Sequence, residues 1–479
     1  MHGTRLRVLS MLMEWARNDP MRIFWLDGLA GTGKTSIAIT LGRMLQADPS
    51  VMLGGTFFCS RTANIPELID ARCILPTLAT ALAEQSPVFA AALAKKLETD
   101  PRAALKSVGF QLASLLQQPL SALASIGRPI VFVIDALDEC NDEKEVKKLL
   151  QGISTLICDA TIKFILTSRP ETHISTSPIS SSDNNSILRL HTIDTAEVTE
   201  DIRFYIDVTF SKSQLTKPWC SDADIMALAA LADGLFIFAS TIIAYILDVS
   251  SVKRREARLR MVLSAVRESK VAMGPLDAMY ELVLTRASDT AKIEPEELDA
   301  TLQVLACILA ARNPLSVNSL ADLIGLEADE LQDSLQRLHA LVHVPDEADQ
   351  PGLRILHASF GDYLFAQNRI SKSLGDQTLA RGCLQVMHER LYFNVTGNQS
   401  SFEPNSMFKP SSITLSLEYA CMQWIYHIKD QGPSATLDDA IDTLFRPQLL
   451  FWLEVMSVLG RVSRAAAMLL LATSTASTI

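Results

Sequence analysis

The stretch Gly28-Leu29-Ala30-Gly31-Thr32-Gly33-Lys34-Thr35 decides the fold of this chain. It matches the phosphate-binding pattern of a glycine, four further residues, and then glycine, lysine and serine or threonine. The apolar segment 23–26 directly before it predicts a buried strand, and the segment 36–45 directly after it predicts a helix. A glycine-rich turn that contains Gly-Lys-Thr by chance would not be expected to have both flanks. The sequence therefore predicts a phosphate loop between a strand and a helix.

The chemistry of such a loop follows from its residue types. Glycines let the backbone curl so that several N–H groups face one anion, and the start of the next helix adds unpaired N–H groups. Lys34 is expected to reach the β- and γ-phosphates of a nucleotide, and the Thr35 hydroxyl to bind Mg²⁺. The expected ligands are therefore ATP or GTP together with Mg²⁺. The expected nucleotide-binding residues are Gly28, Leu29, Ala30, Gly31, Thr32, Gly33, Lys34, Thr35 and Ser36.

Composition describes a globular chain of several domains. The 479 residues suggest about three or four domains of ordinary size. Hydrophobic residues make up 48% and charged residues 20%, which excludes a disordered chain. The formal net charge is −11 and no basic patch stands out, so nucleic acid is not expected as a main partner. The eight cysteines lie singly, without metal-ligand spacing or a framework of bridges, which favours a reducing, cytoplasmic setting.

One apolar segment has about the length of a membrane span. It covers residues 227–247, but Asp233-Gly234 interrupts it and the basic stretch 253–255 follows. A pair of buried helices is the preferred interpretation over a true span. We therefore expect no membrane partner, and the N-terminus also lacks the pattern of a signal peptide.

The first part of the chain alternates between strand and helix patterns. Residues 1–20 predict an amphipathic helix with Leu6, Leu9, Leu12, Met13 and Trp15 on one side, ending at Asp19-Pro20. Segments 53–59, 129–135, 162–168 and 187–190 predict strands. Residues 66–127 predict helices broken by Pro76, Pro87, Pro101 and Pro119, residues 143–157 a further helix, and residues 175–186 an exposed loop.

The pattern changes at about residue 195 to helices with little strand signal. Helices are expected over 195–208, 222–231, 236–248 and 252–288, and again from 297 onward. Two short apolar segments, 340–344 and 353–357, predict a small hairpin after these helices, which suggests a winged-helix-like unit. Residues 371–479 predict further helices without a fixed repeat, with a frayed end from Ala472.

Acidic residues follow the apolar run 129–134 at the predicted carboxyl edge of the sheet. Asp135 is placed to hold Mg²⁺, and Asp138 and Glu139 are the candidates to polarise an attacking water. Arg169, at the end of the next strand, is the candidate to sense the γ-phosphate. The alternatives are an acidic helix start, which carboxylates favour, and an ordinary surface arginine.

Several motifs together resemble the NACHT class of STAND NTPases, and the fungal heterokaryon-incompatibility and Nod-like-receptor type with its nephrocystin-3-like N-terminal domain in particular. They occur in order over roughly residues 1–370, with a further similar block at 419–424. The matching stretches are 25–35, 57–61, 133–139 and 167–170, then 232–236, which resembles a Gly-x-Pro region, and 356–364, which resembles a winged-helix His motif. The resemblance implies an α/β P-loop NTPase, a parallel sheet with helices on both faces, followed by mostly α-helical and winged-helix-like domains.

The resemblance also implies a signalling switch in innate immunity. Such proteins hold ADP or GDP in a closed state, exchange it for the triphosphate, and open to self-associate. Other protein partners, not identified by the sequence, are also implied. The winged-helix His of the family contacts the β-phosphate of the bound diphosphate, and this role falls on His357. The implied domains are a nucleotide-binding domain over 1–192, a helical lid over 193–290, a winged-helix-like domain over 291–370 and a helical region over 371–479.

The chain departs from the family in two respects. Phe236 stands where many relatives have a proline against the base. The phosphate loop begins near the N-terminus, and no WD, ankyrin or leucine-rich repeats follow, so we expect a fragment, a truncated gene model or a minimal form. Two other functions stay open: a scaffold that binds nucleotide without turnover, and a P-loop kinase, against which the long helical tail argues. Whether Asp138 or Glu139 acts in catalysis, and whether ATP or GTP binds, is also open.

Overall fold

The computed structural model divides the chain into two compact units, which are described separately. The first unit comprises Met1–Arg61 and Ile65–Met279, and the second comprises Thr62–Asn64 and Tyr280–Ile479. The expected division into four domains is finer than these two units and stays a prediction. The described residues are 3–124, 126–156, 161–176, 185–212, 219–269, 274–285, 295–345, 347, 350–395, 397, 413–429 and 435–476.

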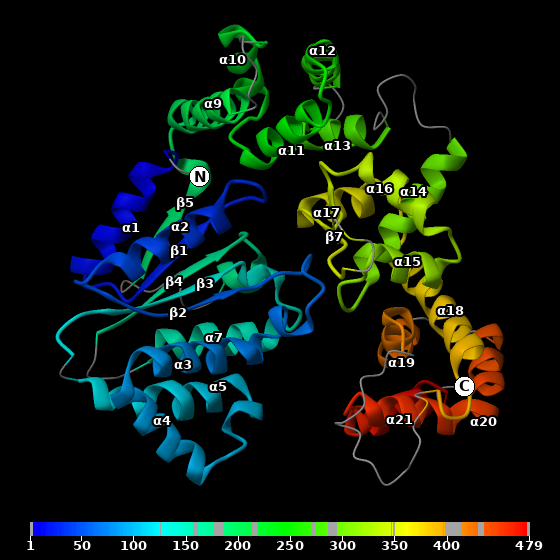
Figure 1. Ribbon diagram of the computed structural model, residues 1–479. Helices are drawn as coiled ribbons and strands as arrows, with labels where there is room; N and C mark the ends of the chain where they lie inside the picture. The colour runs from blue at the N-terminus through cyan, green and yellow to red at the C-terminus, as the bar shows by residue number, and fades with distance from the viewer. Residues whose placement is uncertain are drawn as a thin grey trace. The chain divides into compact units, whose positions relative to one another are not determined.

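A five-stranded parallel sheet forms the centre of the first unit, in the order β2-β3-β4-β1-β5 (Figure 1). Three of the strands are buried along their whole length, which explains their continuous apolar sequences. The expected strands are confirmed with shifts of one or two residues at their ends. The strands are β1 (Ile23–Asp27), β2 (Met52–Phe58), β3 (Ile130–Asp135), β4 (Ile162–Ser168) and β5 (Asn185–Arg189).

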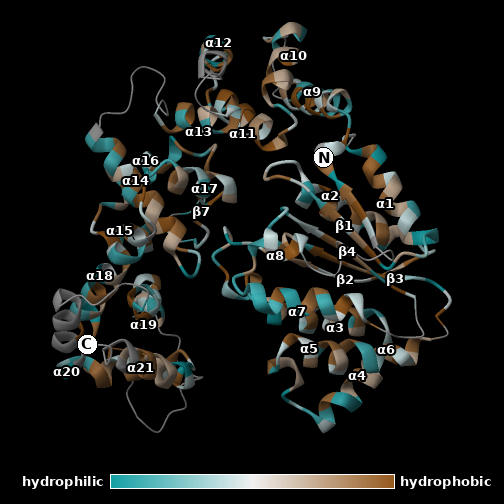
Figure 2. Cartoon of the chain, turned by 180° about the vertical axis from the view of Figure 1, so that it is seen from behind, coloured by the Kyte–Doolittle hydropathy of each residue, from teal (hydrophilic) through white to brown (hydrophobic). Residues whose placement is uncertain are grey.

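Helices cover both faces of this sheet, as expected (Figure 1). On one face α1 (Leu6–Asn18) and α2 (Lys34–Ala47) pack against Val131 and Val133, and on the other α3 (Ile74–Gln85) and α7 (Glu143–Ser154) pack against Phe132 and Ile134. Neighbouring residues of β3 thus serve opposite cores, because side chains alternate along a strand. Figure 2 shows the outer surface of α7 as hydrophilic, in keeping with its solvent face.

Two details of the first unit differ from expectation. Leu6 was expected on the buried side of α1, but it is 61% exposed because the buried stripe begins at Val8. Pro76 and Pro119 do not break helices: Pro76 lies in the first turn of α3, where a missing N–H costs little, and Pro119 lies within a helical run that continues over residues 108–123. The other described helical elements of the first unit before α9 are η1 (Pro66–Leu68), η2 (Ala71–Cys73), α4 (Pro87–Thr99), η3 (Ala103–Leu105), α5 (Val108–Gln111), η4 (Leu112–Gln117), α6 (Gln118–Leu120), η5 (Ser121–Leu123), η6 (Leu137–Glu139), α8 (Thr172–Ser175) and η8 (Leu190–Thr192).

The expected exposed loop over 175–186 is described only at its ends. Ser175 closes α8, and β5 begins at Asn185, so the strand takes up the last residues of the expected loop. Residues 177–184 lie outside the described residues.

Five helices follow the sheet, and the suspected membrane segment is divided between two of them. Asp233 and Gly234 have φ values of 47° and 79°, which end α10 and let the chain turn into α11. No helix among the described residues is long and apolar enough to cross a membrane. The preferred interpretation as two buried helices is confirmed. We call these five the lid helices: α9 (Thr195–Ser211), α10 (Asp222–Leu231), α11 (Phe236–Leu247), α12 (Val252–Ser269) and α13 (Pro275–Thr285).

In the described part of the second unit, helices accompany one short antiparallel hairpin, formed by β6 (Val342–His343) and β7 (Arg354–Ile355). The expected hairpin is therefore confirmed, while its assignment to a winged helix stays a prediction. The frayed end expected from Ala472 is wrong up to Ala476, because the last helix continues to that residue. The helices are α14 (Pro295–Ala310), α15 (Val317–Ile324), α16 (Ala328–Gln336), α17 (Ala358–Ala366), α18 (Lys372–Arg390), α19 (Leu415–Ile428), α20 (Ala435–Val458) and α21 (Val462–Ala476).

A buried polar network joins three segments of the second unit. His427 of α19 is fully buried, and its Nδ1 lies 2.7 Å from Oδ1 of Asp376 in α18, while its Nε2 lies 2.9 Å from the Tyr419 hydroxyl. Arg312 donates from Nη2 to the same Asp376 oxygen at 3.0 Å and from its backbone N–H to the Tyr419 hydroxyl at 3.0 Å. Both His427 nitrogens therefore have partners, whereas Nε of Arg312 is buried without one among the described residues.

Candidate functional site

The phosphate loop lies between β1 and α2, as its flanks predict. Gly33 immediately precedes α2, with φ of 92°, and Gly31 has φ of 80°, a region that favours glycine. The Gly28 N–H donates to the Ser168 carbonyl at 3.3 Å, which ties the start of the loop to the end of β4. The loop is thereby held at the carboxyl edge of the sheet, where ligands of parallel α/β folds bind.

Lys34 is the first residue of α2, and its side chain lies across the loop. Its Nζ donates to the carbonyls of Gly28 at 2.5 Å and of Leu29 at 3.0 Å. Burial lowers the pKa of Lys34, and the nearby charges of Asp138 and Asp135 act in the opposite direction. Lys34 and the acids of the sheet edge thus lie close enough for their charges to interact.

Asp135 ends β3 and is 1% exposed. The Thr167 hydroxyl of β4 donates to its Oδ1 at 2.5 Å and accepts the N–H of Ala136 at 2.9 Å. One threonine therefore fixes both the carboxylate and the backbone that follows it. Thr167 is a residue whose role the sequence did not reveal, although it lies in one of the recognised motifs.

The second oxygen of Asp135 suits a bound cation. Among the described residues, Asp135 Oδ2 is buried and has no hydrogen-bond partner. Burial raises the pKa of this carboxyl group, and the hydroxyls of Thr167 and Thr35 lower it. Thr35 is exposed at the start of α2, so its hydroxyl and Asp135 offer the oxygen ligands that Mg²⁺ prefers. No group of three or more His, Cys, Asp or Glu side chains suited to a metal occurs in the described chain, and Mg²⁺ commonly takes only one or two protein carboxylates beside phosphates and water.

Asp138 and Glu139 lie on a tight turn after β3, here called the acidic turn, residues 136–140. It begins at Ala136 with φ of 56°, which a non-glycine residue rarely adopts. Asp138 is 6% exposed, and its carboxylate is paired with Arg169. The backbone N–H of Arg169 donates to Oδ1 at 2.9 Å, and its Nε lies 3.3 Å from Oδ2. Glu139 is half-buried, and burial raises the pKa of its carboxyl group. The two acids thus have different surroundings: one is paired with Arg169, and the other is held mainly by backbone contacts.

The lid helices contact the phosphate loop directly. The Ile237 N–H at the start of α11 donates to the Gly31 carbonyl at 3.1 Å. A Cβ atom on Gly31 would lie 2.0 Å from Cγ2 of Ile237, so only glycine permits this approach. This contact could not be predicted, because nothing in the pattern pairs a loop glycine with an isoleucine some 200 residues later.

Arg5 makes a second link between the loop and the lid helices. Its Nη2 donates to the Thr32 carbonyl at 3.1 Å, and its backbone N–H donates to Asp201 of α9 at 3.0 Å. Its guanidinium lies 5.1 Å from the centre of the Phe236 ring, a cation–π distance. Phe236, the residue that departs from the family pattern, therefore packs on Arg5, which sequence reasoning missed.

His357 is the one candidate residue that lies in the second unit. It is exposed and directly precedes α17, and its side chain makes no capping hydrogen bond there. Its expected contact with a diphosphate stays a prediction.

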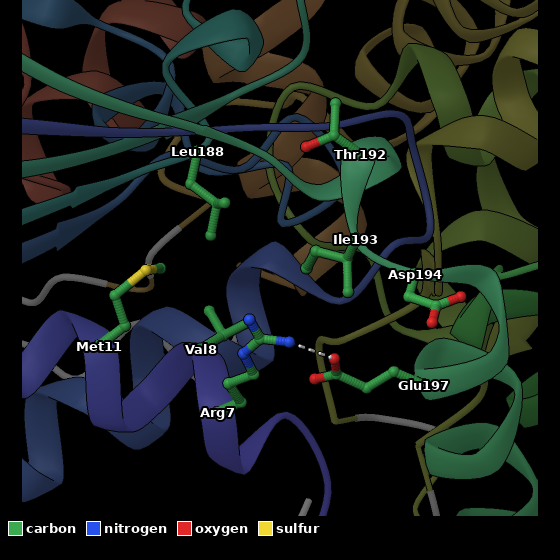
Figure 3. A pocket seen from close by; sticks show the side chains of 8 residues that line it. All are labelled: Arg7, Val8, Met11, Leu188, Thr192, Ile193, Asp194 and Glu197. Carbon is green, nitrogen blue, oxygen red and sulfur yellow. Dashed lines mark hydrogen bonds and ion pairs between the residues drawn. The ribbon is translucent and has the colours of Figure 1, made fainter.

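A cavity of about 510 Å³ lies where the first lid helix leaves the sheet (Figure 3). Its apolar side is formed by residues of α1, β5 and the following turn, and at its rim Arg7 and Glu197 form an ion pair at 3.1 Å. It is distinct from the phosphate loop, none of whose residues line it. The lining residues are Arg7, Val8, Met11, Leu188, Thr192, Ile193, Asp194 and Glu197.

Comparisons with known proteins find a family and a relative that this chain resembles. Residues 5–169 match the family model of the nephrocystin 3 N-terminal domain. The vegetative incompatibility protein HET-E-1 of Podospora anserina is 23% identical, over 93% of this chain and 34% of the relative, so the chain spans about a third of that protein.

Solved structures with a related arrangement include two archaeal proteins. A signal transduction ATPase with numerous domains (STAND) and a tetratricopeptide repeat sensor, from Pyrococcus horikoshii, is 13% identical with a TM-score of 0.39, covering 94% of this chain and 57% of that one. Cdc6p from Pyrobaculum aerophilum is 11% identical with a TM-score of 0.35, covering 77% of this chain and 95% of that one.

The family match spans the phosphate loop, the acidic turn and Arg169, which are the parts that the fold brings to one edge of the sheet. The similarity of residues 5–169 to this family and of the chain to the incompatibility protein supports the resemblance to the NACHT type of STAND P-loop NTPases.

Proposed function

We propose that this protein is a nucleotide-dependent signalling switch. It binds ATP or GTP with Mg²⁺, hydrolyses the triphosphate slowly, and changes between a closed form and an open, self-associating form. The observation that carries the proposal is the hydrogen bond from the Ile237 N–H to the Gly31 carbonyl, since it places a lid helix against the loop that would hold the phosphates. A group that contacts both the nucleotide site and a lid can report the state of the nucleotide.

The binding step rests on the phosphate loop and the start of α2. Gly28 would anchor the loop, the N–H groups of residues 29–36 would surround the phosphates, and Lys34 would exchange its loop carbonyls for phosphate oxygens. Thr35 and Asp135 would hold Mg²⁺, for which the unpartnered Oδ2 of Asp135 is the supporting observation. The metal would neutralise phosphate charge and orient the triphosphate for in-line attack.

Glu139 is the better candidate to polarise the attacking water. Asp138 already accepts two contacts from Arg169, so its carboxylate serves to hold that arginine. The pKa of Glu139 is raised by burial, which makes its carboxylate a stronger base than a solvated one. Arg169 would then lie next to the acid pair, in place to stabilise charge on the γ-phosphate.

The switch step needs the two nucleotides to differ in their affinity for the docked lid. A ligand changes a conformational equilibrium only by as much as it prefers one state. We propose that the diphosphate, ADP or GDP, favours the docked lid with His357 as a further lock, and that the triphosphate favours the undocked form. The proposal includes signalling in the cytoplasm, self-association, and binding to other proteins. The incompatibility relative supports it by its name alone.

Radiolabelled ATP tests the proposal and separates it from the alternatives. The wild-type protein should bind Mg–ATP and release phosphate to water slowly, while Lys34→Ala should bind at least about 100-fold more weakly, because a charged hydrogen-bond donor is lost. Lys147→Ala, at an exposed position on α7, is the matched control. Binding without turnover would favour the scaffold, and transfer of label to an acceptor other than water would favour the kinase. Unchanged affinity in Lys34→Ala would contradict the phosphate-loop assignment.

A further inference from the structure

Arg61 is the third residue after the end of β2 and lies against the acidic turn. Its backbone N–H donates to Glu139 Oε2 at 2.8 Å. Its side chain donates from Nε to the Glu139 carbonyl at 3.2 Å and from Nη2 to the Asp138 carbonyl at 2.5 Å. A single residue thus holds the backbone of both acids and one carboxylate oxygen of Glu139.

The acidic turn has few other hydrogen bonds to hold it. Within the turn, the Glu139 N–H donates to the Ala136 carbonyl at 2.9 Å and the Cys140 N–H donates to the Leu137 carbonyl at 3.2 Å. Its first residue has an unfavourable left-handed backbone, which persists only where surrounding contacts support it. Arg61 supplies such contacts from the β2 side, while Arg169 holds the Asp138 carboxylate from the β4 side.

The segment after β2 and the acidic turn also meet through two cysteines. The thiols of Cys59, next to the end of β2, and Cys140, at the end of the acidic turn, lie 3.5 Å apart and are both buried. The position of Arg61 relative to the turn is therefore supported by packing and does not depend on its own hydrogen bonds alone.

We propose that Arg61 is a positioning residue for nucleotide hydrolysis, which orients the Glu139 carboxylate by holding the acidic turn. The inference rests on the proposed function. The Arg61 N–H uses one acceptor site of Oε2 and fixes the plane of the carboxylate, so that an oxygen of Glu139 is held in place to accept a proton from the attacking water. The side chain of Arg61 touches the turn through carbonyl groups, so it acts through Glu139 and not on the substrate.

The charge of Arg61 has a second effect on the same carboxyl group. Burial raises the pKa of Glu139, and the Arg61 N–H and guanidinium lower it. Removing the charge should therefore raise the pKa of Glu139 further, so that the base is lost at a higher pH. This consequence separates Arg61 from a residue that only stabilises the fold.

Three variants test the role of Arg61 through kcat, KM and the pH profile of ATP hydrolysis. In Arg61→Gln, kcat should fall about 10- to 100-fold with little change in KM, and the acid limb of the profile should move to higher pH. In Arg61→Lys the charge remains, so the acid limb should stay in place while kcat stays reduced, because lysine lacks the two-pronged donor. Arg72→Gln removes an exposed arginine paired with Asp70 on nearby η2 and should leave both quantities unchanged.

A double variant decides whether the effect passes through Glu139. Arg61→Gln combined with Glu139→Gln should be no slower than Glu139→Gln alone. Additive losses, or an Arg61→Gln variant with wild-type kcat and an unmoved acid limb, would overturn the inference. If Arg61→Gln fails to fold, Arg61→Lys decides: wild-type kcat in that variant would equally overturn it.

The wild-type protein separates this inference from the proposed function. A wild-type protein that binds Mg–ATP and never releases phosphate would contradict the proposed hydrolysis, and the role of Arg61 would fail with it. A wild-type protein that turns over while the Arg61 variants behave like Arg72→Gln would contradict only the role of Arg61.

Discussion

Each of the two compact units holds a cluster of charged and polar side chains around an aspartate, and the two aspartates differ in how their carboxylates are bound. In the second unit, Asp376 Oδ1 accepts from Arg312 and lies 2.7 Å from His427, and both nitrogens of His427 have partners. In the first unit, one oxygen of Asp135 is bound by Thr167, while Oδ2 is buried with no partner among the described residues. The arrangement around Asp376 is typical of a structural network, and the arrangement around Asp135 is suited to a ligand.

The difference shows how to separate a structural polar cluster from a functional one. A buried group that is fully paired stabilises the fold, and removing one partner leaves the other group without compensation. A buried carboxylate with an open oxygen instead costs stability until a cation or proton reaches it. Substitutions of Asp376 and of Asp135 should therefore have opposite effects on stability. Only substitutions around Asp135, in the first unit, should affect turnover.

The largest effect is expected at Glu139. Glu139→Gln removes the base but keeps the shape of the side chain, so ATP affinity should be retained while turnover falls about 1000-fold. Phosphate release and equilibrium binding measure the two quantities, with Glu98→Gln on the exposed side of α4 as the control. Normal hydrolysis in Glu139→Gln would move the catalytic role to Asp138.

The next effect tests the structural cluster. Asp376→Ala should lower the free energy of unfolding by about 2 kcal/mol, because the fully buried His427 loses a hydrogen-bond partner and the half-buried Arg312 loses its counter-ion. Urea unfolding measures the change, and Glu330→Ala on exposed α16 should cost far less. A similar loss in both variants would show that the network is no more important than a surface charge.

Asp135→Asn should have the opposite sign. The amide can still accept the Thr167 hydroxyl, and no charge is then buried, so the protein without nucleotide should become more stable by about 1 kcal/mol. The same variant should lose Mg²⁺-dependent turnover. If Asp135→Asn unfolds more easily than the wild type, Asp135 belongs with the structural network and the contrast between the clusters is lost.

The smallest effect is a pH dependence in the second unit. Burial lowers the pKa of His427 in the folded protein, although its bond to Asp376 acts in the opposite direction. The unfolded chain then binds more protons, so stability from this group is present above about pH 6.5 and is lost as the pH falls below it. The melting temperature should fall less between about pH 7 and 5.5 in His427→Gln than in the wild type. An equal fall in both proteins would mean that His427 does not contribute.

The sheet and the phosphate loop were predictable because their signals are local. The apolar runs of β3 and β4, and the glycines beside Lys34, each report on their own segment, and parallel strands bring their ends to one edge. The strand ends shifted by a residue or two, as at Cys59 and Pro129, because burial does not define where pairing stops.

The contacts that orient the site could not be read from the sequence. Arg61, Thr167 and Ile237 act through a few hydrogen bonds to backbone and side-chain groups of distant segments, which leave no periodic pattern. Leu6 was misplaced because helical spacing identifies a stripe but not the residue at which it begins.

Amide hydrogen exchange at Ile237 tests the switch most directly, because that N–H forms the bond between α11 and the phosphate loop. It should be compared in the presence of Mg–ADP and of a non-hydrolysable Mg–ATP analogue, each at saturation. The account predicts strong protection with the diphosphate and clearly faster exchange with the triphosphate analogue. Equal protection with both nucleotides would contradict the claim that the lid reports the state of the nucleotide.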